Sequence, residues 1–104
     1  MKSYQVLMTE PATGDLLATA QYIAKELKEP AAAKKLVSKI REAVMSLSEM
    51  PSRHALITDE RLALLGIRKL PVENYIVFYV ISETNMVVTV VRILYGRRDW
   101  EQIL

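Results

Sequence analysis

Residues 66–100 read GIRKLPVENYIVFYVISETNMVVTVVRILYGRRDW, and this stretch decides the fold of the chain. It is rich in β-branched and aromatic residues and is divided by two short polar breaks, Glu73-Asn74 and 83–85. Such a pattern predicts three successive β-strands joined by tight turns. Strands joined by connections this short are antiparallel neighbours. We therefore expect an antiparallel meander whose strands run over 66–72, from Tyr75 and from Met86.

The last two of these strands are apolar on both faces. An antiparallel sheet commonly leaves one face polar, so a second apolar face needs a cover. The strand exits also carry arginines, at Arg68, Arg92, Arg97 and Arg98. We interpret the region from Tyr75 to Tyr95 as an apolar platform that is too large for the chain's own helices to cover. This hypothesis leaves room for a peptide of another macromolecule beside a cluster of guanidinium groups.

The first half of the sequence predicts a strand followed by two helices. Residues 2–8 alternate in polarity, as a half-buried strand does. Thr9 can then cap a helix that has Pro11 in its first turn. Pro30 ends that helix and starts the next, which Pro51 terminates. Apolar residues recur at helical spacing in both helices. They are Ala12, Leu16, Ala20, Ile23 and Leu27 in the first, and Ala33, Leu36, Val37, Ile40, Ala43, Val44 and Leu47 in the second.

The order of strand, two helices and three strands predicts an α+β fold in a single domain, residues 1–104. The connection between the helices is short, so we expect an antiparallel helical hairpin packed on one face of a mainly antiparallel sheet. The loop from Ser52 to Leu65 has room for one turn of helix, at 59–64. Pro71 suits an edge strand or a bulge, because proline has no N–H to donate to a sheet.

The composition excludes several classes of site. The chain has no cysteine and one histidine, His54, so we expect no disulfide, no thiol nucleophile and no metal site, a carboxylate-only magnesium site being the one alternative; we also expect no cofactor. No apolar run approaches the ~20 residues of a membrane-spanning helix. The start, MKSYQV, lacks the pattern of a secretion signal, so we expect a cytoplasmic protein without a membrane partner. The formal net charge of +2 arises after Glu60, where six basic residues accompany four acidic ones.

That excess of charge favours an anionic partner at the cations of the strand region. The alternative is that strand-end cations stay solvated and prevent edge-to-edge aggregation. Arg92 lies between apolar neighbours, so it is either paired with a carboxylate or directed at a partner. Tyr95 ends its strand beside the arginines, where a phenol can donate a proton or stack on a base. Trp100 is expected to anchor the tail to the body of the protein, together with Ile103 and Leu104, and nothing nearby in sequence orients His54 for catalysis.

Taken together, several segments resemble the RelE/ParE superfamily, the toxins of bacterial type II toxin–antitoxin pairs. They are Met8-Thr9 through Asp15-Leu16, Tyr22-Ile23, Pro30 to Ala33, GIRKLPVENYIVFYVI and VVRILYGRRDW. The resemblance covers almost the whole chain and implies the fold expected above. It also implies a growth-arresting toxin of a plasmid-stabilisation module, neutralised by a cognate antitoxin, with a homodimer or a heterotetramer with the antitoxin as possible assemblies.

The superfamily divides by target: ParE-like members poison DNA gyrase, whereas RelE-like members cut messenger RNA in the ribosome. The segments PVENYIVFY and ILYGRRD resemble the ParE-like side. Lys69 and Arg98 match cations of the RNA-cutting members, but Ile76 and Leu94 stand where those members keep an arginine or a histidine. No tyrosine follows Arg98. We therefore favour gyrase inhibition, with a ribosome-dependent mRNA endonuclease as the alternative and a domain that has lost toxicity as a third hypothesis.

The resemblance and the charge pattern together give one set of candidate contact residues. The residues expected to bind the target or the antitoxin are Arg68, Lys69, Arg92, Tyr95, Arg97, Arg98 and Trp100. If the protein is a nuclease, the catalytic candidates are Arg68, Lys69, Arg98 and Tyr95.

Overall fold

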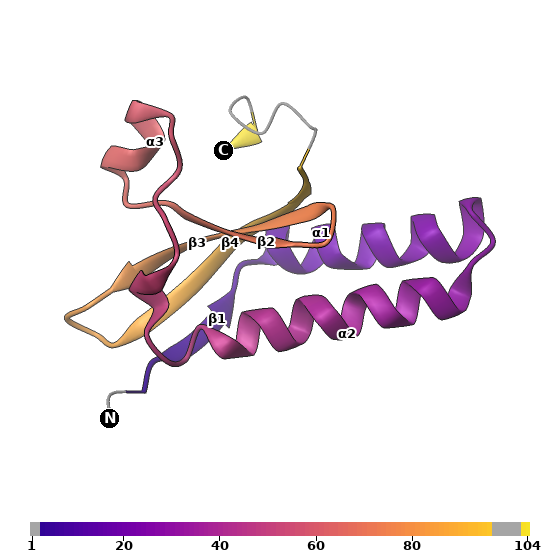
Figure 1. Cartoon of the computed structure of the whole chain (residues 1–104), viewed down its shortest axis with the longest axis horizontal. Helices are drawn as coiled ribbons and strands as arrows, with labels where there is room; N and C mark the ends of the chain where they lie inside the picture. The colour runs from indigo at the N-terminus through magenta and orange to yellow at the C-terminus, as the bar shows by residue number, and fades with distance from the viewer. Residues whose placement is uncertain (1–2, 97–102) are drawn as a thin grey trace.

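The computed structural model describes residues 3–96 and 103–104. Its elements are β1 (Gln5–Met8), α1 (Glu10–Gln21), the π-helical turn η1 (Tyr22–Glu26), α2 (Pro30–Ser46), the 3-10 turn η2 (Pro51–Arg53), α3 (Glu60–Leu64), β2 (Arg68–Val72), β3 (Tyr75–Ser82) and β4 (Val87–Tyr95). The strands form one sheet in the order β1-β4-β3-β2, in which β1 runs parallel to β4 and the other neighbours are antiparallel (Figure 1). The predicted α+β fold, with a helical hairpin and a C-terminal meander, is confirmed.

The predicted start of the first helix is confirmed in atomic detail. The hydroxyl of Thr9 accepts a hydrogen bond from the backbone N–H of Ala12 at 3.1 Å, and Pro11 occupies the first turn. An N-terminal cap of this kind satisfies one of the donors that a helix start leaves without a partner. The preceding strand is shorter than the predicted 2–8, since β1 begins at Gln5. The side chains of Val6 and Met8 pack on the main hydrophobic core.

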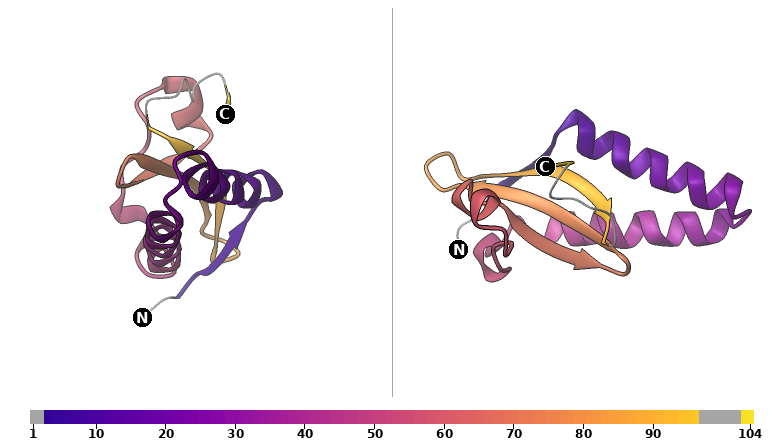
Figure 2. Two further views of the ribbon diagram at one scale, coloured as in Figure 1. Left: turned by 90° about the vertical axis from the view of Figure 1, so that its right-hand side faces the viewer. Right: turned by 90° about the horizontal axis from the view of Figure 1, so that it is seen from above.

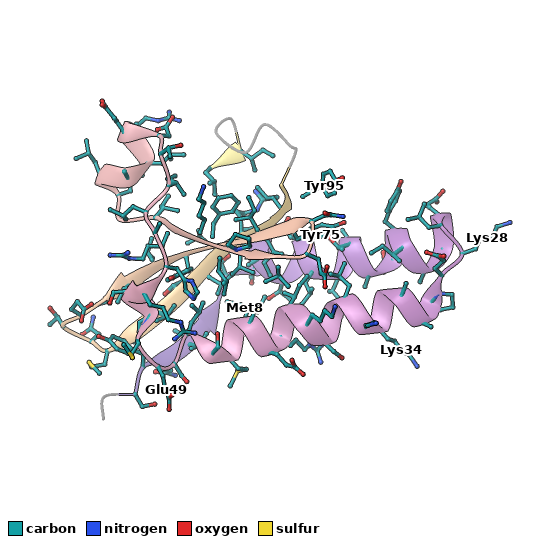
Figure 3. The ribbon with its side chains drawn as sticks, viewed as in Figure 1. Met8, Lys28, Lys34, Glu49, Tyr75 and Tyr95 are labelled. Atoms are coloured by element: carbon teal, nitrogen blue, oxygen red, sulfur yellow. The ribbon has the colours of Figure 1, made fainter. Side chains whose placement is uncertain are left out.

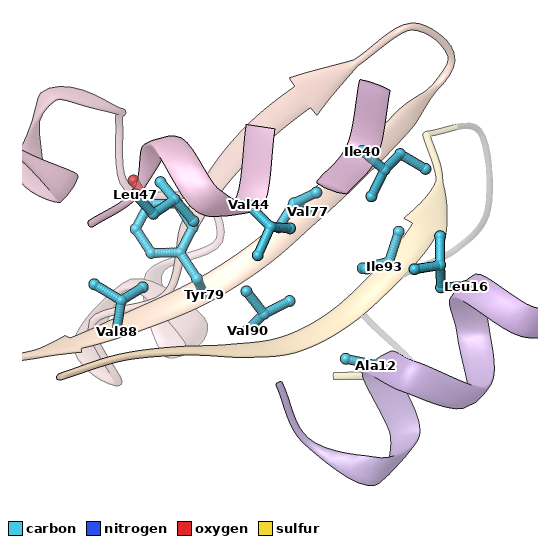
Figure 4. Packing of buried hydrophobic residues seen from close by; sticks show 10 residues of the cluster. All are labelled: Ala12, Leu16, Ile40, Val44, Leu47, Val77, Tyr79, Val88, Val90 and Ile93. Atoms are coloured by element: carbon cyan, nitrogen blue, oxygen red, sulfur yellow. The ribbon is translucent and has the colours of Figure 1, made fainter. Parts of the chain in front are cut away.

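The main core lies between the helical hairpin and one face of the sheet. Figure 4 shows side chains of α1 and α2 meeting those of β3 and β4. Its most deeply buried members include Ala12, Ile40, Leu47, Val77 and Tyr79, each fully hidden from solvent. Leu47, the residue that follows α2, lies seven positions after Ile40 and continues the apolar side of that helix, as the helical spacing predicted.

The hairpin is longer than the sheet on which it packs. Its distal half projects beyond the strands, and the molecule measures 43 × 31 × 21 Å (Figure 2). The prediction that Leu27 lies on the buried stripe of the first helix is therefore wrong, because this side chain is 50% exposed. The helix also widens in η1, where the N–H of Leu27 donates to Tyr22 at 3.2 Å, so the 3.6-residue spacing does not continue through this segment.

The second face of the sheet is covered mostly by this chain, which corrects the expectation that a foreign peptide has to cover it. Ile57, Leu62 and Ile67, from the loop around α3, pack there with Phe78 and Leu94. Ile103 and Leu104 pack against the same cluster. Figure 1 places α3 and the C-terminus on the side of the sheet away from α2. Phe78 is fully buried and Leu94 is 2% exposed, so little of this face remains open at its centre.

The connection between α2 and η2 contains a strained residue that gives a stability prediction. Met50 has φ 47 and ψ 54, the left-handed conformation, and its side chain is 71% exposed. Residues other than glycine pay about 1 kcal/mol or more for this conformation. We expect Met50→Gly to raise the free energy of unfolding by up to about 1 kcal/mol in a urea titration, because little packing is lost.

A matched control for this substitution is another methionine, near the end of α2. Met45 is also a mostly exposed methionine, at 65%, but it lies within the α-helix. Met45→Gly is expected to lower the free energy of unfolding by about 1 kcal/mol. Equal destabilisation by both substitutions would show that the conformation of Met50 carries no strain.

No helix of the described residues is long and apolar enough to cross a membrane. Within the same residues, no group of three or more histidine, cysteine or acidic side chains is placed to hold a metal ion.

Candidate functional site

The predicted cations are distributed over both faces of the sheet. The strand order confirms that β2 and β4 flank β3. The register aligns Lys69, Phe78 and Arg92 in one row, and it places Arg68 beside Tyr79 in the next row. Successive residues of a strand point to opposite faces, so Arg68 lies on the face of the main core and Lys69 on the second face. Arg68 therefore does not share a face with Lys69, and the expected cluster of guanidinium groups stays a prediction, because Arg97 and Arg98 lie outside the described residues.

Arg92 is paired with a carboxylate of its own chain, which decides between the two alternatives predicted for it. Its Nε and one terminal nitrogen donate to the two oxygens of Asp15, each at 2.7 Å. The same carboxylate accepts the backbone N–H of Ile93 at 3.0 Å. The hydrogen bond to Asp15 raises the pKa of Arg92 above its usual value. Asp15 thus neutralises Arg92 and occupies the edge of β4.

Helix α1 substitutes for a neighbouring strand along the second half of β4. β1 pairs with β4 only as far as Met8 and Val90. Beyond that point Thr9 donates from its backbone N–H to Val90 at 3.0 Å and from its hydroxyl to Val91 at 2.9 Å. The Asp15 bond to Ile93 continues this series, so the backbone edge that β1 leaves is partly satisfied by α1.

Arg68 also has a structural role. One terminal nitrogen of its guanidinium donates to the carbonyls of Ser52 at 3.2 Å and His54 at 2.6 Å. The adjacent strand edge is held by the same loop, because the N–H of Lys69 donates to Ala55 at 3.1 Å. Pro71, which has no N–H, occupies the remaining part of this edge, as predicted. Of the other predicted contact residues, Arg97, Arg98 and Trp100 lie outside the described residues.

An open groove lies between the distal hairpin and the ends of β3 and β4. Its volume is about 830 Å³. One wall comes from α1, η1 and α2, the other from the turn after β2 and from the strand ends. The residues lining it are Asp15, Ala18, Thr19, Tyr22, Ile23, Leu27, Leu36, Glu73, Asn74, Tyr75, Ile93, Leu94 and Tyr95. We call this the hairpin groove; Figure 3 shows Tyr75 and Tyr95 beside each other at its strand end, with Lys28 at the far tip of the hairpin.

The strand end of the hairpin groove is fixed by aromatic and backbone contacts. The rings of Tyr75 and Tyr95 meet edge to face, with centroids 5.5 Å apart. The N–H of Gly96 donates to Asn74 at 2.8 Å, and a Cβ on Gly96 would lie 3.3 Å from that same oxygen. Glycine therefore allows the close approach of the strand end to the turn after β2. Tyr95, which the sequence singled out, is 36% exposed here and is available for contact.

The carboxylates that line the hairpin groove are matched by cations. Asp15 holds Arg92, and Glu73 forms a salt bridge with Lys39 of α2. The hydrogen bond from Lys39 is the main reason why the pKa of Glu73 is lowered, with Lys35 contributing a smaller part. With the acids neutralised, the exposed apolar side chains dominate the groove: Tyr22 is 54% exposed and Leu27 is 50% exposed. Such a groove suits an apolar partner segment better than a charged small molecule.

The hairpin groove was not predicted from the sequence, which shows the length of the helices but not how they cross the sheet. The apolar spacing that includes Ile23 and Leu27 continues until Pro30, which makes the helical hairpin about 25 Å long at 1.5 Å per residue. A strand of eight residues such as β3 is of comparable length, but it runs at an angle to the hairpin. Only the crossing of these elements leaves the distal apolar side chains without a sheet beneath them.

Comparison with known proteins assigns the family. The family model of the "ParE toxin of type II toxin-antitoxin system, parDE" matches residues 6–100. Since this match spans nearly the whole sequence, the chain belongs to the ParE toxin family, within the RelE/ParE superfamily that its motifs resemble. A search of the curated proteins found no match.

Solved structures of type II systems share the fold. The chromosomal ParDE system of P. aeruginosa aligns with a TM-score of 0.73 at 23% identity, over 91% of this chain and 98% of that chain. The toxin–antitoxin complex RelBE2 of Mycobacterium tuberculosis aligns with a TM-score of 0.64 at 21% identity, over 89% and 98%. A mutant of the E. coli toxin RelE in the free state aligns with a TM-score of 0.64 at 14% identity, over 98% and 99%.

Proposed function

We propose that this type II toxin arrests growth in the ParE-like manner, by inhibiting DNA gyrase, and that a cognate antitoxin neutralises it. The ParE family match supports this target, as does the resemblance of PVENYIVFY and ILYGRRD to ParE-like toxins. The RelE-like alternative requires a site that cleaves RNA. Such a site needs a base for the 2′-hydroxyl, an acid for the leaving oxygen and cations for the charge that develops on phosphorus.

The observation that supports gyrase rather than RNA as the target is that Arg68 and Arg92 are both hydrogen-bonded within the chain. Arg92 is neutralised by two hydrogen bonds to Asp15, and Arg68 is bound to two loop carbonyls. Arg92 cannot turn to a phosphate without losing its bonds to Asp15, and the terminal nitrogen of Arg68 that binds the loop cannot do so without losing both carbonyls. Lys69 is on the opposite face from Arg68, so these two of the cations that a nuclease would combine do not share a face.

We further propose that the antitoxin inserts an amphipathic helix into the hairpin groove. The solved relatives include a toxin–antitoxin complex of the same fold, and the groove offers exposed apolar side chains between two elements. Lys39 pairs with Glu73 at the groove, and Lys35 is near enough to Glu73 to lower its pKa, so two lysines of α2 flank this part of the groove. An apolar stripe flanked by acidic residues is the complementary surface.

The target is tested by inducing the toxin in bacteria and comparing two readouts. Gyrase inhibition is expected to stall replication and induce the DNA-damage response while transcript ends stay unchanged. Cuts in phase with the codons of translated messages would overturn the proposal in favour of the nuclease. Normal growth at confirmed expression of folded protein would instead favour a domain that has lost toxicity.

A further inference from the structure

A half-buried histidine that the proposed function does not use, His54, lies where η2, β2 and β3 meet. The ring nitrogen Nε2 of His54 is hidden from solvent and has no hydrogen-bond partner among the described residues. The ring meets Tyr79 edge to face, with the centroids 6.3 Å apart. A buried polar atom without a partner costs free energy, and the cost rises if the group becomes charged.

The charged groups around His54 are positive. Burial is the largest cause of the lowered pKa of His54. The positive charges of Arg53 in η2 and Arg68 in β2 lower this pKa further. Tyr79 of β3 stays neutral, because burial raises its pKa to about 12. Glu49 and Asp59, each five positions away, are the acidic residues closest in sequence; the side chain of Glu49 is exposed (Figure 3), and that of Asp59 accepts the backbone N–H of Leu62 at the start of α3. Protonation would therefore place a third positive charge beside two guanidinium groups.

Neither guanidinium can move away without breaking bonds that hold the same segment. Arg53 donates to the carbonyl of Glu49 at 2.6 Å and to the hydroxyl of Ser46 at 3.2 Å. Arg68 donates to the carbonyl of His54 itself at 2.6 Å. The hydroxyl of Tyr79 donates to the carbonyl of Pro51 at 2.6 Å. Repulsion between a protonated His54 and the guanidinium groups of Arg53 and Arg68 is thus relieved most directly by displacement of the segment 50–57.

We propose that His54 is a proton-operated latch: in its neutral form it keeps the segment 50–57 packed against β2 and β3, and its protonation releases that segment. The segment carries Ile57, whose N–H donates to Ile67 at 3.1 Å and whose side chain covers part of the second face. Release consequently loosens the cover over Phe78. This inference concerns local opening of the fold and does not depend on the toxin's target.

The direction of the pH dependence follows from the lowered pKa of His54. In the open state the imidazole regains its ordinary pKa of about 6.5 and binds a proton more readily than in the closed state. Opening therefore becomes more favourable as the pH falls through about 6.5 toward the lower pKa of the closed state. Above about 7.5 the latch is fully neutral in both states and contributes no pH dependence.

The latch is tested by titrating the imidazole signals of the only histidine by NMR and by measuring amide hydrogen exchange at pH 7.5 and pH 5.5. We expect an imidazole pKa below 6.5 and, after correction for intrinsic exchange, a threefold to tenfold loss of protection at pH 5.5 for amides of 50–57 and 67–69. The amides of α2 before residue 46 serve as the internal control, and their corrected protection is expected to stay the same.

The variant His54→Phe keeps an aromatic ring but cannot be protonated. Its segment 50–57 is expected to keep the same protection at both pH values. The inference is wrong if the variant shows the same loss as the wild type, or if the wild-type imidazole titrates at or above 6.5. The wild-type NMR titration decides the question even if the variant fails to fold.

Discussion

Replacement of Asp15 by alanine is expected to lower the free energy of unfolding by about 2 to 3 kcal/mol. The substitution leaves the guanidinium of Arg92, with 27% of its side chain exposed, without its carboxylate. It also removes the acceptor of the Ile93 N–H at the edge of β4. Removing one partner of a buried ion pair lowers the free energy of unfolding by about 3 to 5 kcal/mol. The partial exposure of Arg92 and Asp15 reduces that figure. Urea unfolding followed by circular dichroism measures the change.

Glu10 provides the control for Asp15. It is an exposed acidic residue in the first turn of the same helix, so Glu10→Ala removes a similar charge near the helix N-terminus. Its expected cost is below about 1 kcal/mol. The double variant Asp15→Leu/Arg92→Met removes both charges, and we expect it to recover most of the loss. If Asp15→Ala is no more destabilising than Glu10→Ala, the pair does not hold α1 to β4.

The second prediction with a large expected effect concerns the affinity of the toxin for its antitoxin. We expect Leu27→Asp to weaken binding of the purified antitoxin by about 100-fold, or about 2.7 kcal/mol, in isothermal titration calorimetry. Leu27 lines the hairpin groove and is 50% exposed, so a carboxylate is tolerated in the free toxin. In the complex the same carboxylate would be buried among apolar side chains without a partner.

Leu17 offers a matched control for this experiment. It is a leucine of α1 with 59% exposure, and it does not line the hairpin groove. Leu17→Asp is expected to change the antitoxin affinity by less than about threefold. Equal losses of affinity in the two variants would remove the hairpin groove as the antitoxin site, without bearing on the toxin's target.

The sequence predicted those parts of the fold that local patterns determine. The cap at Thr9, the helix boundary at Pro30, the turn at Glu73-Asn74 and the edge position of Pro71 each follow from the chemistry of a few adjacent residues. The two apolar faces of β3 were also evident, because alternation is absent from its sequence. From these elements the meander of β2, β3 and β4 and the packing of the helical hairpin on the sheet could be expected, whereas the place of β1 beside β4 was not predicted.

The parts that the sequence did not predict depend on contacts between distant residues. Asp15 and Arg92 are 77 positions apart, so the charge pattern left open whether Arg92 was paired. The cover over the second face comes largely from Ile57 and Leu62, which lie in a region expected to be mainly loop, and from Ile67, which was expected in a strand. The hairpin groove depends on how far the helices extend past the strands, and that distance follows from the packing angle.

The most direct test of the proposed function is a DNA supercoiling assay with purified gyrase and purified toxin. The proposed function predicts that the toxin inhibits supercoiling, that equimolar antitoxin restores it, and that the antitoxin is at least tenfold less effective against Leu27→Asp. Full supercoiling activity at saturating concentrations of folded toxin, together with cleavage of messenger RNA on purified ribosomes, would contradict it.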